Sequence, residues 1–501
     1  MNIPRILRTI IHLRPVQVFY QVKTRIFKSY FKQEISSEAS LGYQLTAPVE
    51  KGVSFDGNSF SFLNLCSHFD NWNFTSNGML WAYNLNYMDW LGQEGMTYKE
   101  GAKWIDRFID DIPNNKVGLD PYPIALRGIN WIKFISKHHD RVEPDRLKRW
   151  NDSLFSQYRL LEKKLEWHLL GNHLLEDAYS LFIASIYFND AKMYRKYSRL
   201  LRHQLKEQVL PDGAHYEQSP MYHCILLDRL LDCYNISVNN ILFPKQTELN
   251  AYLREMSVKM LGHLDSIIYQ NGDIPLLNDS AFGIAPSPSD LFSYAERLGI
   301  RWGTIPLKEC GYRRFNNGKY EAVIDVGNIT ASYQPGHTHA DSLNYELRID
   351  GRPYIVDTGI STYNKTERRQ FERSTIAHNC ISPDGKDSSE VWGGFRVGRR
   401  CHTEVLEDSD ESIIALHDGF GIPCKRRFHI SEDCVTVEDW YEGDAVSYIH
   451  LAEGADINRI TIEGAKEVCL KDYQYSTEYN VFHNGKVIEI HFNGHLKYTI
   501  R

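Results

Sequence analysis

Two histidines, His337 and His339, stand two residues apart in the stretch Gly-His-Thr-His-Ala-Asp of this 501-residue chain. The segments 329–333 and 343–349 on either side have the composition of strands. Residues i and i+2 of a strand point to the same face, so both imidazoles could reach into one site. They could act there together, or they could be ordinary hydrogen-bonded or surface histidines.

Two later segments could complete a metal site with this pair. Val-Asp-Thr-Gly places Asp357 on one predicted strand, and Ala-His-Asn places His378 on another. Zinc binds neutral imidazole nitrogens and carboxylate oxygens. The sequence therefore predicts a structural divalent metal, with zinc favoured and calcium as the alternative, provided that the three strands are neighbours.

A second polar cluster opens a predicted helix at Gly171-Asn172-His173. Asn172 could cap this helix, because an asparagine side chain satisfies free backbone N–H groups at a helix start. His173 and Glu176 have i,i+3 spacing, so the carboxylate could orient the imidazole. The alternative is a plain helix cap with an exposed ion pair.

The stretch 212–223 is dense in groups that transfer protons or form hydrogen bonds: Tyr216, Glu217, Gln218, Tyr222 and His223. Ser219-Pro220 also marks a helix start within it, and the tyrosines could serve only packing.

Two arginines and one turn are further candidates for binding an acidic ligand. Arg127 lies in an otherwise apolar predicted helix and could clamp a carboxylate through two hydrogen bonds, or form a structural ion pair. Arg373 could contact acidic sugar groups, and the turn 277–280, which contains Asp279, could line the binding cleft; either could instead be structural.

These candidates lie on two kinds of segment. From about residue 79 to 300 the pattern is helical, with breakers between the expected helices 96–111, 122–138, 143–164, 172–188, 190–208, 219–235 and 246–268. After about residue 310 the chain is rich in β-branched residues between turns, as in 320–326, 354–357, 434–440 and 487–492. We expect stacked helical hairpins followed by layered antiparallel sheets.

Charge is distributed unevenly along the chain. The net charge is −7, yet residues 1–33 hold seven basic residues and no acid, which leaves −14 for the rest. A body of this charge is not a nucleic-acid binder. Residues 16–31 predict an amphipathic helix that either lies on an anionic membrane surface or packs on its own domain.

The compartment is predicted from cysteines and from the N-terminus. Nine scattered cysteines without a Cys-x-x-Cys pair indicate reduced thiols. No segment reaches the roughly 20 apolar residues of a membrane span, and no clear signal peptide is recognisable. We expect a cytoplasmic or inner-membrane-associated protein, with the periplasm as the alternative.

Taken in order, the motifs Asn-His-x-x-Glu, Glu-Gln-Ser-x-x-Tyr-His, His-x-His-Ala-Asp, Val-Asp-Thr-Gly and Ala-His-Asn resemble those of the heparinase II/III-like polysaccharide lyases. The resemblance covers roughly residues 75–500. It implies an incomplete (α/α) toroid, expected at 76–310, and an antiparallel β-sandwich, expected at 311–501, after a basic helix and irregular segment at 1–75. It also implies β-elimination on a uronic-acid-containing acidic polysaccharide.

The resemblance also assigns roles. Tyr222 and His337 match the catalytic tyrosine and histidine, Asn172 and His173 match the groups that neutralise the substrate carboxylate, and Glu176 matches the acid supporting them. His339, Asp357 and His378 match the metal positions. We place Arg127, Tyr216, Gln218 and Arg373 with Glu176 as expected substrate-binding residues, and Tyr216 is also the weaker candidate for the tyrosine role.

Two chemistries for proton transfer remain open at this stage. Tyr222 could be both base and acid, or His337 could be the base and Tyr222 the acid. A uronyl C5-epimerase would use the same groups, and a non-catalytic glycan-binding protein of a surface-polysaccharide assembly system is the third hypothesis. The polymer and the oligomeric state are left open.

Overall fold

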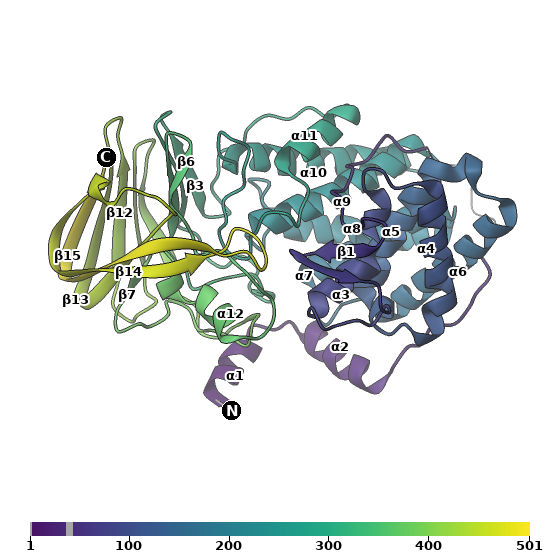
Figure 1. The fold of residues 1–501 in the computed structure, drawn as a ribbon, viewed down its shortest axis with the longest axis horizontal. Helices are drawn as coiled ribbons and strands as arrows, with labels where there is room; N and C mark the ends of the chain where they lie inside the picture. The colour runs from purple at the N-terminus through teal and green to yellow at the C-terminus, as the bar shows by residue number, and fades with distance from the viewer. Residues whose placement is uncertain (1–2, 37–43) are drawn as a thin grey trace.

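A computed structural model describes residues 3–36 and 44–501 of the chain. A helical half precedes a β half, and the two lie side by side along the long axis of the molecule (Figure 1). The predicted fold class, a helical toroid followed by an antiparallel β domain, is confirmed.

Twelve α-helices occur in the described residues, joined in places by single 3-10 turns. They are α1 Ile3–Ile10, α2 Pro15–Ile26, α3 Met79–Tyr87, α4 Tyr98–Asp111, α5 Pro121–His138, α6 Pro144–Lys164, α7 Gly171–Tyr187, α8 Ala191–Gln208, α9 Pro220–Asn239, α10 Gln246–Ile267, α11 Pro288–Arg297 and α12 Glu367–Glu372. The seven helices expected from the sequence correspond to α4 through α10, with ends that differ by up to four residues. Helices α3 and α11 were not individually expected.

Helix α7 runs through the centre of the helical half. Every residue of α7 except His173 is buried. A helix that is covered on all sides belongs to the core of a domain, and α7 packs against α5, α8 and α9. Its single partly exposed residue therefore marks where this core opens to solvent.

The β half is one curled antiparallel sheet. The strands of the chain are β1 Ser59–Phe62, β2 Leu65–His68, β3 Tyr312–Asn316, β4 Tyr320–Asp325, β5 Tyr345–Ile349, β6 Arg352–Ile355, β7 Ile381–Ser382, β8 Val391–Trp392, β9 Arg396–Val397, β10 Thr403–Asp408, β11 Ser412–His417, β12 Cys424–Ile430, β13 Val435–Leu451, β14 Ile460–Tyr475 and β15 His483–Ile500. The main sheet has the order β10-β11-β12-β13-β6-β5-β4-β3, and β15 joins β14 to β13.

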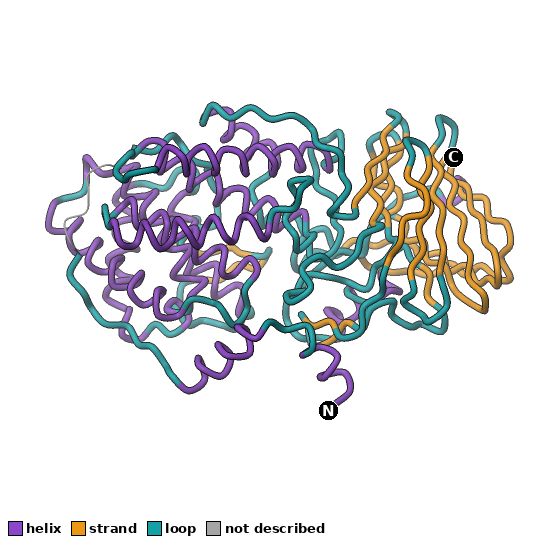
Figure 2. The backbone as a smooth tube through the Cα atoms, turned by 180° about the vertical axis from the view of Figure 1, so that it is seen from behind, coloured by secondary structure: helices purple, strands orange, loops and turns teal. Residues whose placement is uncertain are grey.

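Alternation explains why these strands form layers. Along β12 every second residue is buried, as expected where one sheet face packs on a core and the other meets solvent. The strands curve around that core, while long loops extend from the sheet toward the helices (Figure 2). The core of the helical half extends into these loops through Ala331, Tyr333, Ile360 and Tyr479.

One sequence expectation about the loops is wrong. Residues 329–333, expected as a strand, have no regular structure, whereas the expected strand after the histidines is β5. The backbone between Gly336 and Ala340 is irregular as well, so His337 and His339 are not on one strand face.

The N-terminal segment forms two helices rather than the single expected helix 16–31. Helix α1 buries no residue and α2 buries only Gln17. The expected packing of an amphipathic helix on its own domain is therefore slight. No helix in the described ranges is long and apolar enough to cross a membrane.

Candidate active site

A cavity of about 940 Å³ opens between the helical half and the loops of the β half. Four predicted catalytic residues line it: Asn172 and His173 from the start of α7, Tyr222 from the first turn of α9, and His337 from the irregular loop. Three segments far apart in sequence thus supply one site.

Asn172 is placed by the strained start of α7. Gly171 has φ +58°, and a Cβ there would lie 2.5 Å from Glu217 Oε1, so only glycine fits. The Asn172 backbone N–H donates to Glu217 Oε1 at 2.8 Å and its Nδ2 donates to Oε2 at 2.9 Å. The expected capping role of Asn172 is wrong, because its side chain turns to Glu217 and Leu170 is the N-cap residue.

His173 is held by an acid other than the expected one. Its Nδ1 lies 3.1 Å from Glu166 Oε2 in the loop before α7. Burial lowers the pKa of His173, but the Glu166 carboxylate outweighs it and the net pKa is raised above the usual value. Glu176, the expected partner, is buried inside the domain, 3.8 Å from Arg229 Nε, and burial raises its pKa to about 7.

Tyr222 and His337 stack on each other. Their ring centroids are 3.8 Å apart with planes inclined by 28°, and Tyr363 Oη lies 3.4 Å from Tyr222 Oη. Burial raises the pKa of Tyr222, and the nearby carboxylates of Asp279 and Glu217 add to the increase. The free site therefore keeps this phenol protonated.

Both ring nitrogens of His337 have carboxylate oxygens within reach. Nδ1 lies 2.9 Å from Asp279 Oδ2, and Nε2 lies 3.3 Å from Glu217 Oε2 and 3.4 Å from Asn172 Nδ2. If Nδ1 donates to Asp279, Nε2 carries the lone pair and can accept a proton.

His339 shares the carboxylate that holds His337. Its Nε2 lies 2.8 Å from Asp279 Oδ1, and Arg369 donates to both oxygens of Asp279 at 2.5 and 2.7 Å. Arg369 and the two histidines hold the pKa of Asp279 well below its usual value despite burial. One ionised carboxylate thus fixes both histidines.

The expected metal ligands lie together in a fully buried region behind His337. His378 Nδ1 is 2.7 Å from Asp357 Oδ2, and the His339 and His378 rings are 5.2 Å apart. In the described part of the chain, His339 Nδ1 and His378 Nε2 are buried without a hydrogen-bond partner. Two unpaired imidazole nitrogens near a carboxylate are a donor set that fits a divalent cation.

A different group has ligand atoms close enough to share one ion in the present arrangement. Asp212, His263 and Cys310 are buried, and one ligand atom of each lies within 4.8 Å of the others. His339, Asp357 and His378 are not such a group among the described residues, so Asp357, which also accepts from Asn344 at 2.6 Å, would have to turn to bind an ion with them.

Four expected substrate-binding residues do not line the cavity: Arg127, Tyr216, Gln218 and Arg373. Arg127 donates to Gln157 Oε1 and to the carbonyl oxygens of Asn86 and Gly118, so its donors are used inside the helical half. Arg373 donates to the carbonyl oxygen of Thr338, between the two histidines, at 2.7 Å. Both arginines hold backbone rather than face the cavity.

The other two residues join the halves of the molecule. Tyr216 Oη is 2.9 Å from Tyr333 Oη, and Gln218 Nε2 donates to the carbonyl oxygen of Cys310 at 2.7 Å. Their hydrogen bonds explain why polar residues gather before α9 without all of them facing the cavity.

Sequence reasoning missed several contributors: Glu166, Tyr363 and Arg369 as partners of the candidates, and Arg229 and Arg400 as cations lining the cavity. Glu217 stood inside the dense motif, and Asp279 in a turn that was expected to be near the site. Glu166, Tyr363 and Arg369 carried no spacing signal.

Comparisons with known proteins agree with this architecture. The heparinase II/III N-terminus model matches residues 127–287, and the heparinase II/III-like C-terminal model matches residues 300–495. A heparin-sulfate lyase of Pedobacter heparinus is 26% identical over 245 residues, 43% of this chain and 36% of that protein. One of Bacteroides thetaiotaomicron is 21% identical over 329 residues, 56% of this chain and 46% of that protein.

The chain thus spans less than half the length of these two relatives. A crystal structure of heparinase III superposes with a TM-score of 0.68 at 15% identity, covering 97% of this chain and 91% of that one. The two models together cover most of the chain, in the order of its helical and β halves. The chain belongs to the heparinase II/III-like family.

Proposed function

We propose that this protein is a polysaccharide lyase that cleaves a uronic-acid-containing glycan by β-elimination. The observation that carries the proposal is the stacked pair of Tyr222 and His337, with Asn172 and His173 beside it on one cavity. Elimination needs a neutralised carboxylate, a base for the α-proton and an acid for the leaving oxygen. The four side chains have these chemistries.

Carboxylate neutralisation falls to Asn172 and His173. An Asn172 amide N–H can donate to the uronate. Protonated His173 supplies positive charge, and the Glu166 carboxylate favours this protonated form by raising the pKa of the imidazole. Donors fixed in advance stabilise the charge that develops on the carboxylate when the α-proton leaves. Arg400 lines the same cavity and adds positive charge to it.

Proton transfer divides between the stacked rings. The raised pKa of Tyr222 favours the neutral phenol, which suits a proton donor to the glycosidic oxygen. His337 is then the base through Nε2, with Nδ1–H donating to Asp279. Glu217 Oε2 lies 3.3 Å from Nε2 and would accept a hydrogen bond from the proton that arrives there.

A divalent metal, with zinc favoured, would be held by His339, Asp357 and His378 and would supply a structural anchor for the loop that carries His337. The donor set and the two unpaired nitrogens support this. The polysaccharide itself is assigned by class only, as an acidic glycan.

A screen of defined uronic-acid polymers tests the function, with ultraviolet absorbance of the unsaturated product as the readout. We expect Tyr222→Phe to lose roughly 10²- to 10⁴-fold in kcat while glycan binding is retained. Tyr216→Phe is the matched control, because Tyr216 is a tyrosine that does not line the cavity. It should keep most of the activity.

The same screen separates the rival activities. Deuterium uptake at C5 from heavy water without an absorbance increase would replace the lyase by an epimerase. Binding of glycan without turnover, unchanged in Tyr222→Phe, would make the protein a non-catalytic binder.

A further inference from the structure

The N-terminal helices present an apolar stripe to solvent. On α1 the stripe follows helical spacing through Ile3, Leu7 and Ile10 and continues to Ile11 just after the helix. On α2 it follows Val18, Phe19, Val22 and Ile26; these eight residues are between 43% and 73% exposed. Eleven of the 24 large exposed hydrophobic residues in the described chain lie between residues 3 and 35. Exposed apolar side chains are thus concentrated on this segment, and such patches mark contact sites.

The remaining sides of the helices are fastened to the body. Arg5 and Arg8 pair with Glu390 at 3.0 and 2.7 Å, in the loop region of the β half. Gln17 donates to the carbonyl oxygens of Leu169 and Tyr333 and is buried. Both helices lie along the lower side of the molecule, beneath the junction of the halves (Figure 1). The polar contacts therefore fix the helices with their apolar stripe still uncovered.

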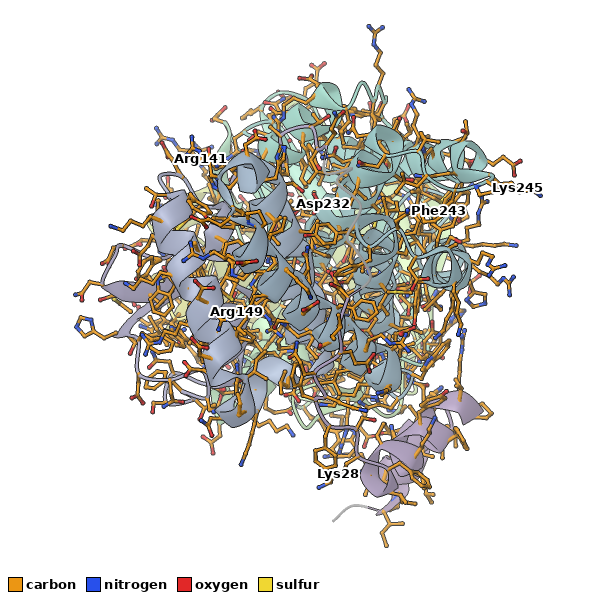
Figure 3. The ribbon with its side chains drawn as sticks, turned by 90° about the vertical axis from the view of Figure 1, so that its right-hand side faces the viewer. Lys28, Arg141, Arg149, Asp232, Phe243 and Lys245 are labelled. Atoms are coloured by element: carbon orange, nitrogen blue, oxygen red, sulfur yellow. The ribbon has the colours of Figure 1, made fainter. Side chains whose placement is uncertain are left out.

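Cations accompany the stripe. Arg25, Lys28 and Lys32 are exposed, and none of them forms an ion pair with a described residue. Lys28 lies at the lower edge of the molecule, beside the projecting N-terminal helices (Figure 3). Residues 1–33 contain no acid, while the rest of the chain carries a net charge of −14. An anionic surface is therefore complementary in charge to this segment.

We propose that α1 and α2 dock the protein on an anionic lipid bilayer. A helix lying in a bilayer interface combines an apolar face with lysines and arginines that reach the lipid headgroups, and the N-terminal segment has both. Lysine and arginine stems also extend easily from the apolar zone to the headgroups. The N-terminal segment is where exposed apolar side chains and unpaired cations occur together, so we expect the bilayer contact on this side.

Docking would set the orientation of the cavity. Ile10 of the stripe lines it, as do Ile6 of α1, Gln17 of α2 and His12 in the turn between the two helices. A bilayer against the apolar stripe would therefore lie next to one wall of the cavity, and glycans attached to or gathered at that membrane would reach it first. This consequence depends on the proposed function, but the docking does not.

Vesicle flotation of the full chain, without glycan, tests the docking. We expect the protein to float with vesicles of equal parts phosphatidylcholine and phosphatidylglycerol, not with phosphatidylcholine alone, and to release as salt rises. Arg25→Gln, Lys28→Gln and Lys32→Gln together should weaken binding roughly a hundredfold, from three lost charges. The matched control replaces three exposed lysines elsewhere, Lys99, Lys137 and Lys206, by Gln and should bind as the wild type does.

A second variant tests the apolar stripe. Ile11→Asn, Phe19→Asn and Ile26→Asn together change residues that do not line the cavity, so activity on soluble glycan should persist while flotation is lost. Leu406→Asn, Val468→Asn and Leu470→Asn, at similarly exposed sites in the β half, are the control. Circular dichroism melts confirm folding of each variant.

Three outcomes would overturn the proposal. One is a wild-type protein that floats with neither vesicle. Another is equal binding to neutral and anionic vesicles with no effect of the charge variant. The third is a dimer in solution that Ile11→Asn, Phe19→Asn and Ile26→Asn dissociate, because a second copy would then cover the stripe. None of these depends on catalysis, so a failed activity screen leaves the docking test intact.

Discussion

His337 and His339 are two residues apart, but their surroundings differ. His337 lines the cavity and stacks on Tyr222, whereas the His339 side chain is completely buried beside His378. Both bind Asp279, one through Nδ1 and the other through Nε2. The buried carboxylate of Asp279 therefore connects the candidate catalytic histidine, His337, to the fully buried region around His339 and His378.

The irregular backbone makes this division feasible. On a strand, positions 337 and 339 would point to the same face. Here the loop lets each ring approach Asp279 from a different side, and Arg373 holds the loop by donating to Thr338. Arg369 compensates the buried charge of Asp279. The site can therefore be broken at either histidine with separate consequences.

The largest expected effect separates the two regions. His337→Ala should lower kcat by about 10³-fold with a stability change near 1 kcal/mol, because a proton carrier is lost from a site that stays folded. His339→Ala should instead lower the free energy of unfolding by about 2–3 kcal/mol, since removing this fully buried side chain leaves a cavity in addition to taking one partner from Asp279. Initial rates on the responding glycan and urea melts measure both. Equal loss of kcat in the two variants would contradict the division.

Asp279→Asn should affect both regions at once. The amide leaves Arg369 buried without its counter-charge, which costs about 3 kcal/mol or more of stability. The neutral amide also no longer holds the His337 ring through an ionised acceptor at Nδ1. We expect kcat to fall roughly 10- to 100-fold, by analogy with other orienting carboxylates, with little change in KM. Arg368→Gln is the control, since Arg368 pairs with Glu372 rather than with Asp279. A changed KM with normal kcat would assign Asp279 to substrate binding instead.

The same comparison shows what sequence can foresee. Helical patterning and breakers predicted α4 through α10, because apolar or amphipathic stretches of helical length lie between Pro, Gly and Asn in this part of the sequence. Local motifs at helix starts or beside glycine also selected Asn172, His173, Tyr222 and His337 as candidates, and the structure brings these four to one cavity. Partners remote in sequence were beyond this reasoning: Arg369 meets Asp279 across 90 residues.

The sequence did not reveal which charged residues are buried and bound to other parts of the protein. Arg127 and Arg373 have the groups that clamp an acidic sugar, yet both donate to neutral backbone oxygens, and burial lowers the pKa of each to about 9. Residue type cannot reveal whether a guanidinium faces a ligand or a carbonyl. The His173 partner was misjudged for a related reason: the i,i+3 rule favoured Glu176, while the loop before α7 brings Glu166 closer.

Metal removal sharpens the comparison on the buried side. If an ion joins His339 to His378, chelation should lower the free energy of unfolding by about 2–3 kcal/mol, as expected for saturating metal. His378→Ala should abolish this chelator sensitivity, and His263→Ala should preserve it. Sensitivity lost only in His263→Ala would move the metal to the Asp212, His263 and Cys310 group.

The smallest expected effect concerns pH and lies on the cavity side. The folded pKa of His173 is raised above its usual 6.5, so the protonated imidazole is fully present below that value and is lost as pH rises through the raised pKa. The pair with Glu166 therefore contributes both stability and carboxylate neutralisation on the acidic side of that transition. Glu166→Gln removes the charge that raises the pKa of His173, so the alkaline limb of kcat/KM should move to lower pH. Glu176→Gln, which alters the expected but more distant acid, should leave the limb nearly in place. If the alkaline limb moved only in Glu176→Gln, Glu176 would be the acid that supports His173. The i,i+3 spacing within α7, rather than the loop that carries Glu166, would then orient the imidazole.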